Sequence, residues 1–307
     1  NMLKELITNY DVIEDLKGKL ESSVCLRERK NILLKAIKLY EEKEFEIFNN
    51  ILPIQIEGMF ADFLMDTTIF SRFKNMNIYA NAVLKEKIKH LQEVESNIYP
   101  EVVEYFMYYF NNIIRNRIAH GRYYGNTEDK QDEIFSRELI LDMSLLVHML
   151  SRNSETEKMY RFIEGCHVHY KRLGDSLHES PYFSILFSYM IGETLICDYD
   201  MVENYKPIQV AYWLINPYYE KIYEQVGDKK NLLELREIFL SKDFWNYVLN
   251  KLNDIITKNS CYENINIEFK SVVKGLFKCG ISEDVKTILK KVYSLLTKIF
   301  EKQKVPK

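Results

Sequence analysis

Glycine and proline are scarce in this chain. Its 307 residues include 10 glycines and 6 prolines, about 3% and 2%, where average usage is about 7% and 5%. Turns should therefore be few and helices long. The 47% of residues that are hydrophobic are enough for a substantial core, and the length lies at the border between one large domain and two.

Paired cysteines, a strong net charge and a long apolar run are also missing. The five cysteines are scattered, without the Cys-x-x-Cys spacing of a zinc site or redox couple, and we expect reduced thiols of a cytoplasmic protein. The longest apolar run, 182–196, is interrupted by Ser184, Ser188, Gly192 and Glu193, so it is too short and too polar to span a bilayer. The formal net charge of −3 argues against a strongly basic coat for nucleic acid, but it leaves room for a local patch.

What the sequence does contain is helical periodicity almost throughout. In the first half we expect helices over 26–49, 53–73, 81–94, 100–120 and 134–151, with a polar loop over 122–133. In the second half we expect them over 156–173, 181–197, 207–226, 232–240, 243–257, 265–277 and 282–302. The chain should be all-α. Ser151–Ser154 is the best candidate joint between a region 1–152 and a second helical region 153–307.

The helix that begins at Pro100 has the clearest apolar face. Its apolar residues fall within about 160° of arc at about 100° per residue. They are Val102, Val103, Phe106, Met107, Phe110, Ile113, Ile114 and Ile118. Gly121 should end this helix, because glycine adopts the left-handed conformation at a helix C-terminus without a side-chain penalty.

A polar cluster stands at the end of that helix, where Arg115, Asn116 and His120 lie within six residues. Arginine can grip phosphate with a planar fork, and histidine can transfer protons near neutral pH. Asn116 lies one helical turn before His120 and can orient its imidazole. Such a set suits phosphodiester cleavage without a metal. A plainer interpretation is that cationic residues here complement the helix dipole.

The run Arg115–His120 resembles the Arg–Asn–x–x–x–His signature of HEPN domains, a helical nucleotide-binding family of higher eukaryotes and prokaryotes. Asn112 before it and Gly121 after it are similar to the flanks of this signature in bacterial phage-defence and toxin members. The segment 52–58, Leu-Pro-Ile-Gln-Ile-Glu-Gly, is similar to the helix that precedes the motif helix in some of those proteins. The resemblance covers residues 24–152 and does not extend to the C-terminal half.

The resemblance implies a helical bundle that acts as a metal-independent endoribonuclease and leaves a 2′,3′-cyclic phosphate and a 5′-hydroxyl. Carried over by position, the resemblance implies that His120 is the general acid/base, that Arg115 binds the scissile phosphate, and that Asn116 orients His120 or the phosphate. Family members that are silenced by nucleotide transfer onto tyrosine carry His-x-Tyr. Here Tyr123 comes one residue late, which puts that regulation in doubt.

The spacing of the motif also bears on its partners. Arg115 and His120 lie about 140° apart around an ideal α-helix, so one regular helix cannot point both at one phosphate. HEPN nucleases place their motif helices across a dimer interface. We therefore expect a homodimer with a composite site and RNA as substrate, and a regulatory protein partner fits the toxin-like members.

Three further residues are candidates for support of the motif. Glu57 interrupts an apolar stripe, so we expect it to pair with an arginine such as Arg115 or Arg117, or to lie in an interface. Asn112 precedes the motif and Arg117 lies within it, and both belong to the family-like run.

Other residues are candidates for RNA contact. Tyr123 and Tyr124 can stack on bases with Arg122 on the backbone, or they can simply anchor the loop. Lys85 and Lys89 belong to a locally basic segment that can follow an RNA backbone, although a solvated helix face is the commoner explanation for such a segment.

Three functions remain open on sequence alone. The first is a HEPN ribonuclease of the toxin or abortive-infection kind. The second is a non-catalytic HEPN-fold module that binds RNA, nucleotide or protein, and the third is a scaffold with a fortuitous motif. We expect no metal or cofactor, because His167 and His169 would point about 160° apart on a helix. A motif in an accessible cleft or dimer seam favours the first function, and a motif inside the core favours the third.

Overall fold

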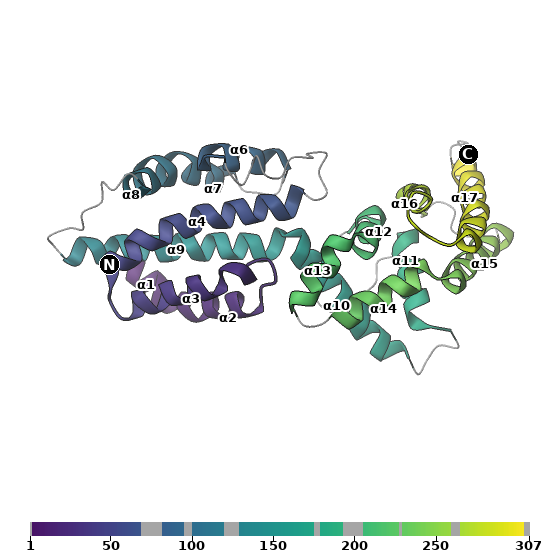
Figure 1. Cartoon of the computed structure of the whole chain (residues 1–307), viewed down its shortest axis with the longest axis horizontal. Coiled ribbons are helices and arrows are strands. Elements are labelled where there is room, and N and C mark those ends of the chain that lie inside the picture. Colours follow the sequence, from purple (N-terminus) through teal and green to yellow (C-terminus); the bar gives the residue numbers. More distant parts are fainter. Residues whose placement is uncertain are drawn as a thin grey trace. The chain divides into compact units, whose positions relative to one another are not determined.

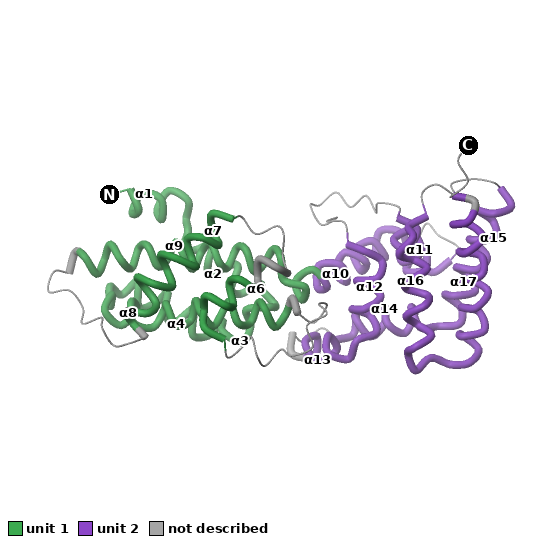
Figure 2. Tube along the Cα trace, turned by 90° about the horizontal axis from the view of Figure 1, so that it is seen from above, with its two compact units in different colours: residues 1–158 green, residues 159–307 purple. Residues whose placement is uncertain are grey.

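The computed structural model describes residues 2–68, 82–94, 100–119, 129–174, 179–192, 205–226, 229–258 and 265–303. Helices make up nearly all of these residues, and none of them forms a strand. The predicted all-α class is confirmed. Among the described helices, none has the combination of length and apolarity that crossing a bilayer requires. The chain divides into two compact units, residues 1–158 and 159–307, which Figure 2 distinguishes by colour.

Unit 1 is built around two long helices that pack against each other, α4 (Phe45–Thr68) and α9 (Asp129–Asn153). The helices on one side of this pair are α1 (Met2–Asn9), α2 (Val12–Ser22) and α3 (Arg27–Glu41). Those on the other side are α6 (Leu84–Val94), α7 (Pro100–Glu104), η1 (Tyr105–Arg115) and α8 (Asn116–Ala119) (Figure 1). The candidate motif therefore lies in the layer formed by α6, η1 and α8.

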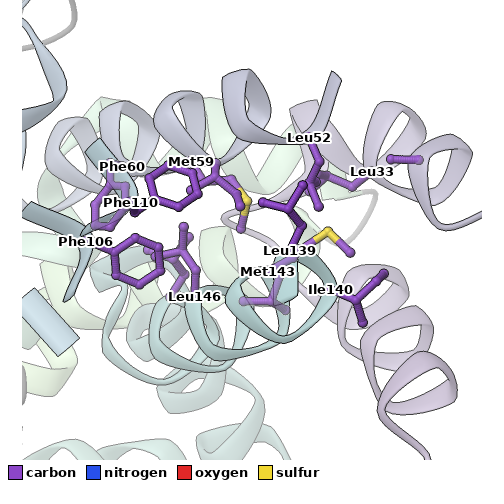
Figure 3. Close-up of a cluster of buried hydrophobic side chains, with 14 of the residues drawn as sticks. Leu33, Leu52, Met59, Phe60, Phe106, Phe110, Leu139, Ile140, Met143 and Leu146 are labelled. Atoms are coloured by element: carbon purple, nitrogen blue, oxygen red, sulfur yellow. The ribbon is translucent and has the colours of Figure 1, made fainter. Parts of the chain in front are cut away.

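The core of unit 1 joins these layers through large apolar side chains. Figure 3 shows Met59 and Phe60 of α4 near Phe106 and Phe110 of η1. The Phe60 and Phe106 rings meet edge to face with their centroids 5.1 Å apart. Each such buried aromatic side chain stabilises the fold by about 1.5–3 kcal/mol. The packing fixes η1 against α4, and so it also fixes the position of Arg115 at the end of η1.

The helix that we expected over 26–49 is interrupted, and that prediction was wrong. The chain leaves α3 after Glu41, and Lys43 adopts a left-handed conformation with φ of 64°. The amide of Lys43 donates to the carbonyl of Tyr40, and the amide of Glu44 donates to that of Leu39. This is the Schellman arrangement that usually places glycine at the left-handed position. Lysine in that position gave no sequence signal for the break.

Pro53 was expected in the first turn of a helix, but it lies inside α4. A proline there removes one backbone hydrogen bond and crowds the carbonyl four residues earlier, which belongs to Asn49. The helix continues because both sides of the proline are anchored. Phe48, Leu52 and Ile56 are fully buried, and the Asn49 side chain bonds the backbone carbonyl of Asp132 on α9.

The motif helix begins at Pro100 as predicted, but it is not a regular α-helix. From Tyr105 to Arg115 its backbone forms a π-helix, in which the amide of Asn116 donates to the carbonyl of Asn111. The wider turn changes which residues face inward. Asn111 is buried, whereas Ile113, which we expected in the apolar face, is 55% exposed. The 140° separation expected between Arg115 and His120 concerns the residues after this π-helix, where Asn116–Ala119 are α-helical and His120 lies outside the described residues.

A buried polar junction ends the α4–α9 pair. Helix α9 stops at Asn153, and Ser154 caps α10 (Glu155–Leu173) by accepting from the amide of Glu157. Asp66 of α4 accepts from the hydroxyl of Ser154 and from the amide of Thr156. The Glu157 carboxylate accepts from the Ser23 hydroxyl at 2.6 Å. These bonds satisfy helix-end amides that would otherwise be buried without partners.

Unit 2 continues α10 with seven further helices among the described residues. They are α11 (Pro181–Ile191), α12 (Pro207–Ile215), α13 (Pro217–Val226), α14 (Lys229–Leu240), α15 (Lys242–Lys258), α16 (Glu268–Leu276) and α17 (Glu283–Gln303). Trp213 and Trp245 lie in its core. The expected helix 207–226 is divided, because Asn216 precedes Pro217 and is held in an extended conformation. The expected helix 181–197 ends at Ile191, where Gly192 has φ of 87°.

Candidate functional site

The centre of the candidate site is a contact between α4 and the end of η1. The Nε atom of Arg115 donates to Oε2 of Glu57 at 2.6 Å. The Glu57 side chain is 14% exposed and that of Arg115 is 24% exposed. Of the two roles expected for Glu57, the structure shows the pairing with Arg115. A guanidinium held in this way keeps its direction, because the carboxylate that fixes it belongs to α4, which packs against α3, α6 and α9.

Lys87 of α6 completes the contact from a second side. Its Nζ donates to Oε1 of Glu57 at 3.0 Å, and its side chain is only 6% exposed. Sequence reasoning considered only the neighbouring Lys85 and Lys89 of this basic segment as candidates and did not identify Lys87 as a partner of Glu57. The signal was present, since Lys87 lies beside Ile88 and one turn after Leu84, on the apolar face of its helix. A lysine on such a face needs a buried partner.

Asn116 faces Arg115 from the first position of α8. Its Oδ1 accepts from Nη1 of Arg115 at 3.1 Å. Glu57 and Asn116 together take two of the five N–H donors of the guanidinium. The remaining three have no partner among the residues that the structure describes. Within the described residues, the guanidinium is thus held by Glu57 and Asn116 through two of its donors.

The charges of this cluster favour an anion. Burial alone raises the pKa of Glu57, but hydrogen bonds from Arg115 and Lys87 outweigh it and hold the pKa below its ordinary value. Glu57 is therefore ionised at neutral pH. Among the described residues, one carboxylate between two cations leaves the cluster with one net positive charge. In a partly buried site that charge is screened less than it would be at an open surface.

The structure describes only some of the other candidate residues. His120, Gly121, Arg122, Tyr123 and Tyr124 lie outside the described residues, as does the side chain of Arg117. Asn112 is exposed, and its Oδ1 accepts from the side chain of buried Asn111. Lys85 and Lys89 are exposed on α6. The structure therefore brings together Glu57, Lys87, Arg115 and Asn116, and it leaves Lys85 and Lys89 on a solvated face.

The outer face of η1 is apolar at three positions. Tyr108, Tyr109 and Ile113 are all exposed, with Tyr108 at 58%. Asn112 lies among them in sequence. Aromatic residues on a helix surface are enriched in protein interfaces. This face belongs to the same helix that ends at Arg115.

A second arginine clamp lies on α4 next to Glu57. The guanidinium of Arg29 from α3 pairs with both carboxylate oxygens of Asp62, and it donates to Oε1 of Gln55 at 3.1 Å. Gly58 makes room for it, because a Cβ atom there would lie 2.3 Å from Cζ of Arg29. Two adjacent residues of α4 therefore have different roles. Glu57 serves the motif, and Gly58 serves the packing of α3.

No group of three or more His, Cys, Asp or Glu side chains in the described part of the chain is arranged to hold a metal ion. His167 instead places Nδ1 2.7 Å from the hydroxyl of Tyr182.

Comparisons with models of known protein families, with curated proteins and with solved structures find no match to this chain.

Proposed function

We propose that this chain is a metal-independent endoribonuclease of the HEPN kind, of the type found among toxins and phage-defence proteins, and that it acts in the cytoplasm. The observation that carries the proposal is the Arg115 guanidinium. Glu57 and Asn116 fix it, and Lys87 supports Glu57. Three of its N–H donors have no partner among the described residues, and we assign them to a ligand. A purely structural arginine would be expected to satisfy more of its donors within the protein.

The chemistry assigned to the motif needs two kinds of group. Attack by a ribose 2′-oxygen requires proton transfer, and it builds negative charge on the phosphorane oxygens. We assign proton transfer to His120 and charge stabilisation to Arg115. Asn116 directs its side-chain oxygen to Arg115, so we assign it the orientation of the arginine. Its amide N–H groups have no partner among the described residues, and we assign them to His120 or phosphate.

The proposal includes a homodimer across η1. Tyr108, Tyr109 and Ile113 offer an exposed apolar face on the helix that ends at Arg115. A second copy on that face would bring two motifs to one groove, as the resemblance implies. A regulatory protein partner could cover the same face in the manner of an antitoxin.

The test is cleavage of a synthetic single-stranded RNA by the purified chain in EDTA. Wild type should cut the RNA, leave 2′,3′-cyclic phosphate and 5′-hydroxyl ends, and spare DNA of the same sequence. His120→Ala should abolish cleavage, and His169→Ala, which removes another histidine, should not. If both variants cleave equally, the chemistry lies elsewhere. If RNA is bound but never cut, the chain is a non-catalytic binding module.

A further inference from the structure

The charges of this chain are segregated along the sequence. Residues 265–307 contain ten lysines and four Asp or Glu residues, which is a net +6 within a chain of net −3, so residues 1–264 carry −9. Such an asymmetry is typical of a segment that binds a polyanion. The structure describes 265–303 of this segment. There α16 and α17 pack against each other, and Figure 2 shows them within unit 2.

Lysines recur at one-turn intervals on both helices. Lys270 and Lys274 lie on α16, and Lys278 follows in the turn after it. Lys286 and Lys290 repeat the spacing on α17. Residues four apart on a helix share a face and are separated by about 6 Å along the axis. The two helices therefore present two rows of cations rather than scattered charges.

The nearby carboxylates leave most of these cations uncompensated. Glu283 pairs with Lys286 at 2.6 Å, and Asp284 pairs with Lys242 at 3.2 Å. Lys274, Lys278 and Lys290 are exposed and have no ion pair within the described residues. A solvated helix face usually intersperses both signs of charge. This face does not.

An aromatic ring lies where the two helices meet. The Nζ of Lys270 on α16 lies 4.9 Å from the ring centroid of Tyr293 on α17. The ring of Phe277 lies 6.4 Å from that of Tyr293. Both rings are half-buried. A partly exposed aromatic ring flanked by cations is the pairing that binds single-stranded nucleic acid, because bases stack on the ring and phosphates meet the lysines.

We propose that the α16–α17 face binds the backbone of single-stranded RNA and so delivers substrate to the chain. The proposal rests on the ribonuclease function proposed above. The face lies in unit 2, whereas the motif lies in unit 1, so binding and cleavage can be tested with separate variants. Its lysines contribute to affinity through the release of counterions, and that contribution depends on salt in a predictable way.

The experiment measures binding of a fluorescent single-stranded RNA by the full chain carrying His120→Ala, which prevents cleavage. The affinity is followed against salt concentration. Replacement of Lys274, Lys278 and Lys290 by glutamine should reduce the slope of log K against log salt by about 2, because each phosphate contact on a single strand contributes about 0.7. All three side chains are exposed, so the melting temperature should not change.

The matched control replaces three exposed lysines elsewhere, Lys35, Lys221 and Lys230. It removes the same total charge and should leave the salt slope unchanged. Equal slopes for the two triple variants would overturn the proposal while leaving cleavage by wild type intact. Lysine-dependent binding to vesicles of anionic lipid, without binding to RNA, would also overturn it. Lysine-dependent RNA binding by a wild-type chain that never cleaves would support the surface and refute the ribonuclease.

Discussion

Arg115 and Glu57 join the last residue of the π-helix to the central helix of unit 1 through a 2.6 Å hydrogen bond. The bond is charge-assisted and partly buried, and Lys87 contacts the other carboxylate oxygen. Glu57 therefore determines where the guanidinium points. If the motif is catalytic, Glu57 is a positioning residue that acts through Arg115.

Glu57→Gln should impair cleavage more than it impairs folding. The amide keeps the shape but offers one neutral acceptor to two cations, which should cost about 2 kcal/mol of stability. We expect cleavage to fall about 100-fold through loss of orientation. Chemical denaturation and single-turnover cleavage measure the two effects.

The matched control for that variant is Asp62→Asn on the same helix. Asp62 holds Arg29 rather than Arg115, so its loss should destabilise unit 1 without affecting the site. Equal losses of activity in the two variants would show that Glu57 matters only for stability.

Part of this site could be predicted from the sequence. Glu57 in an apolar stripe and Arg115 at the end of an apolar helix indicated a buried pair, because a lone charge there would be costly. Lys87 escaped notice because three alternate lysines suggest a solvated surface. Lys87 lies beside Ile88 and one turn after Leu84, on the apolar face of its helix. Tertiary packing against that face buries Lys87 and leaves the other two lysines exposed.

The helical class could also be predicted, but several helix ends could not. The break at Lys43 depends on a left-handed lysine where glycine is usual. The continuation through Pro53 depends on long-range packing of α4. The exposure of Ile113 follows from π-helical hydrogen bonding, which the 3.6-residue period used for sequence patterns does not describe.

The stability of unit 1 should depend on pH through Asp142 of α9. Burial raises the pKa of this carboxyl to about 7, although the Tyr105 hydroxyl donates to it at 2.9 Å, and Glu138 adds to the shift. The folded state thus holds a proton that the unfolded state releases near pH 4, so this stabilisation is lost as pH rises through about 7.

Asp142→Asn should remove that dependence, because the amide is neutral at every pH. Between pH 5 and pH 8 wild type should lose about 2.7 kcal/mol relative to the variant, because the loss of about 1.4 kcal/mol per pH unit stops near pH 7. Denaturant unfolding at both pH values measures the difference. Parallel pH profiles for the two proteins would show that Asp142 ionises normally.

Gly58→Ala should destabilise unit 1, although alanine favours helix. Its Cβ would lie 2.3 Å from Cζ of Arg29, so the guanidinium must shift, and we expect its bonds to Asp62 and Gln55 to weaken. We expect a net loss of about 1 kcal/mol. A charged hydrogen bond contributes about 1.5–3 kcal/mol, and the higher helix propensity of alanine offsets part of that loss. Gly18→Ala on α2 meets no atom within 4 Å, and it should stabilise by up to about 1 kcal/mol. Thermal melts of both variants measure these changes in stability. A Gly58→Ala variant more stable than wild type would contradict the stabilising role assigned to the contacts of Arg29.

A double-variant comparison tests whether Glu57 acts through Arg115. Arg115→Lys keeps the charge and can still reach Glu57, but an ammonium cannot bind Asn116 and a phosphate in one plane. We expect cleavage to fall about 100- to 1,000-fold, as for loss of a transition-state donor. Once the guanidinium is gone, its orientation no longer matters. Glu57→Gln should therefore cost little more in the Arg115→Lys background, within about threefold, whereas it costs about 100-fold alone. If the two losses multiply instead, Glu57 has a role of its own, such as proton transfer, and the positioning role assigned to it is wrong.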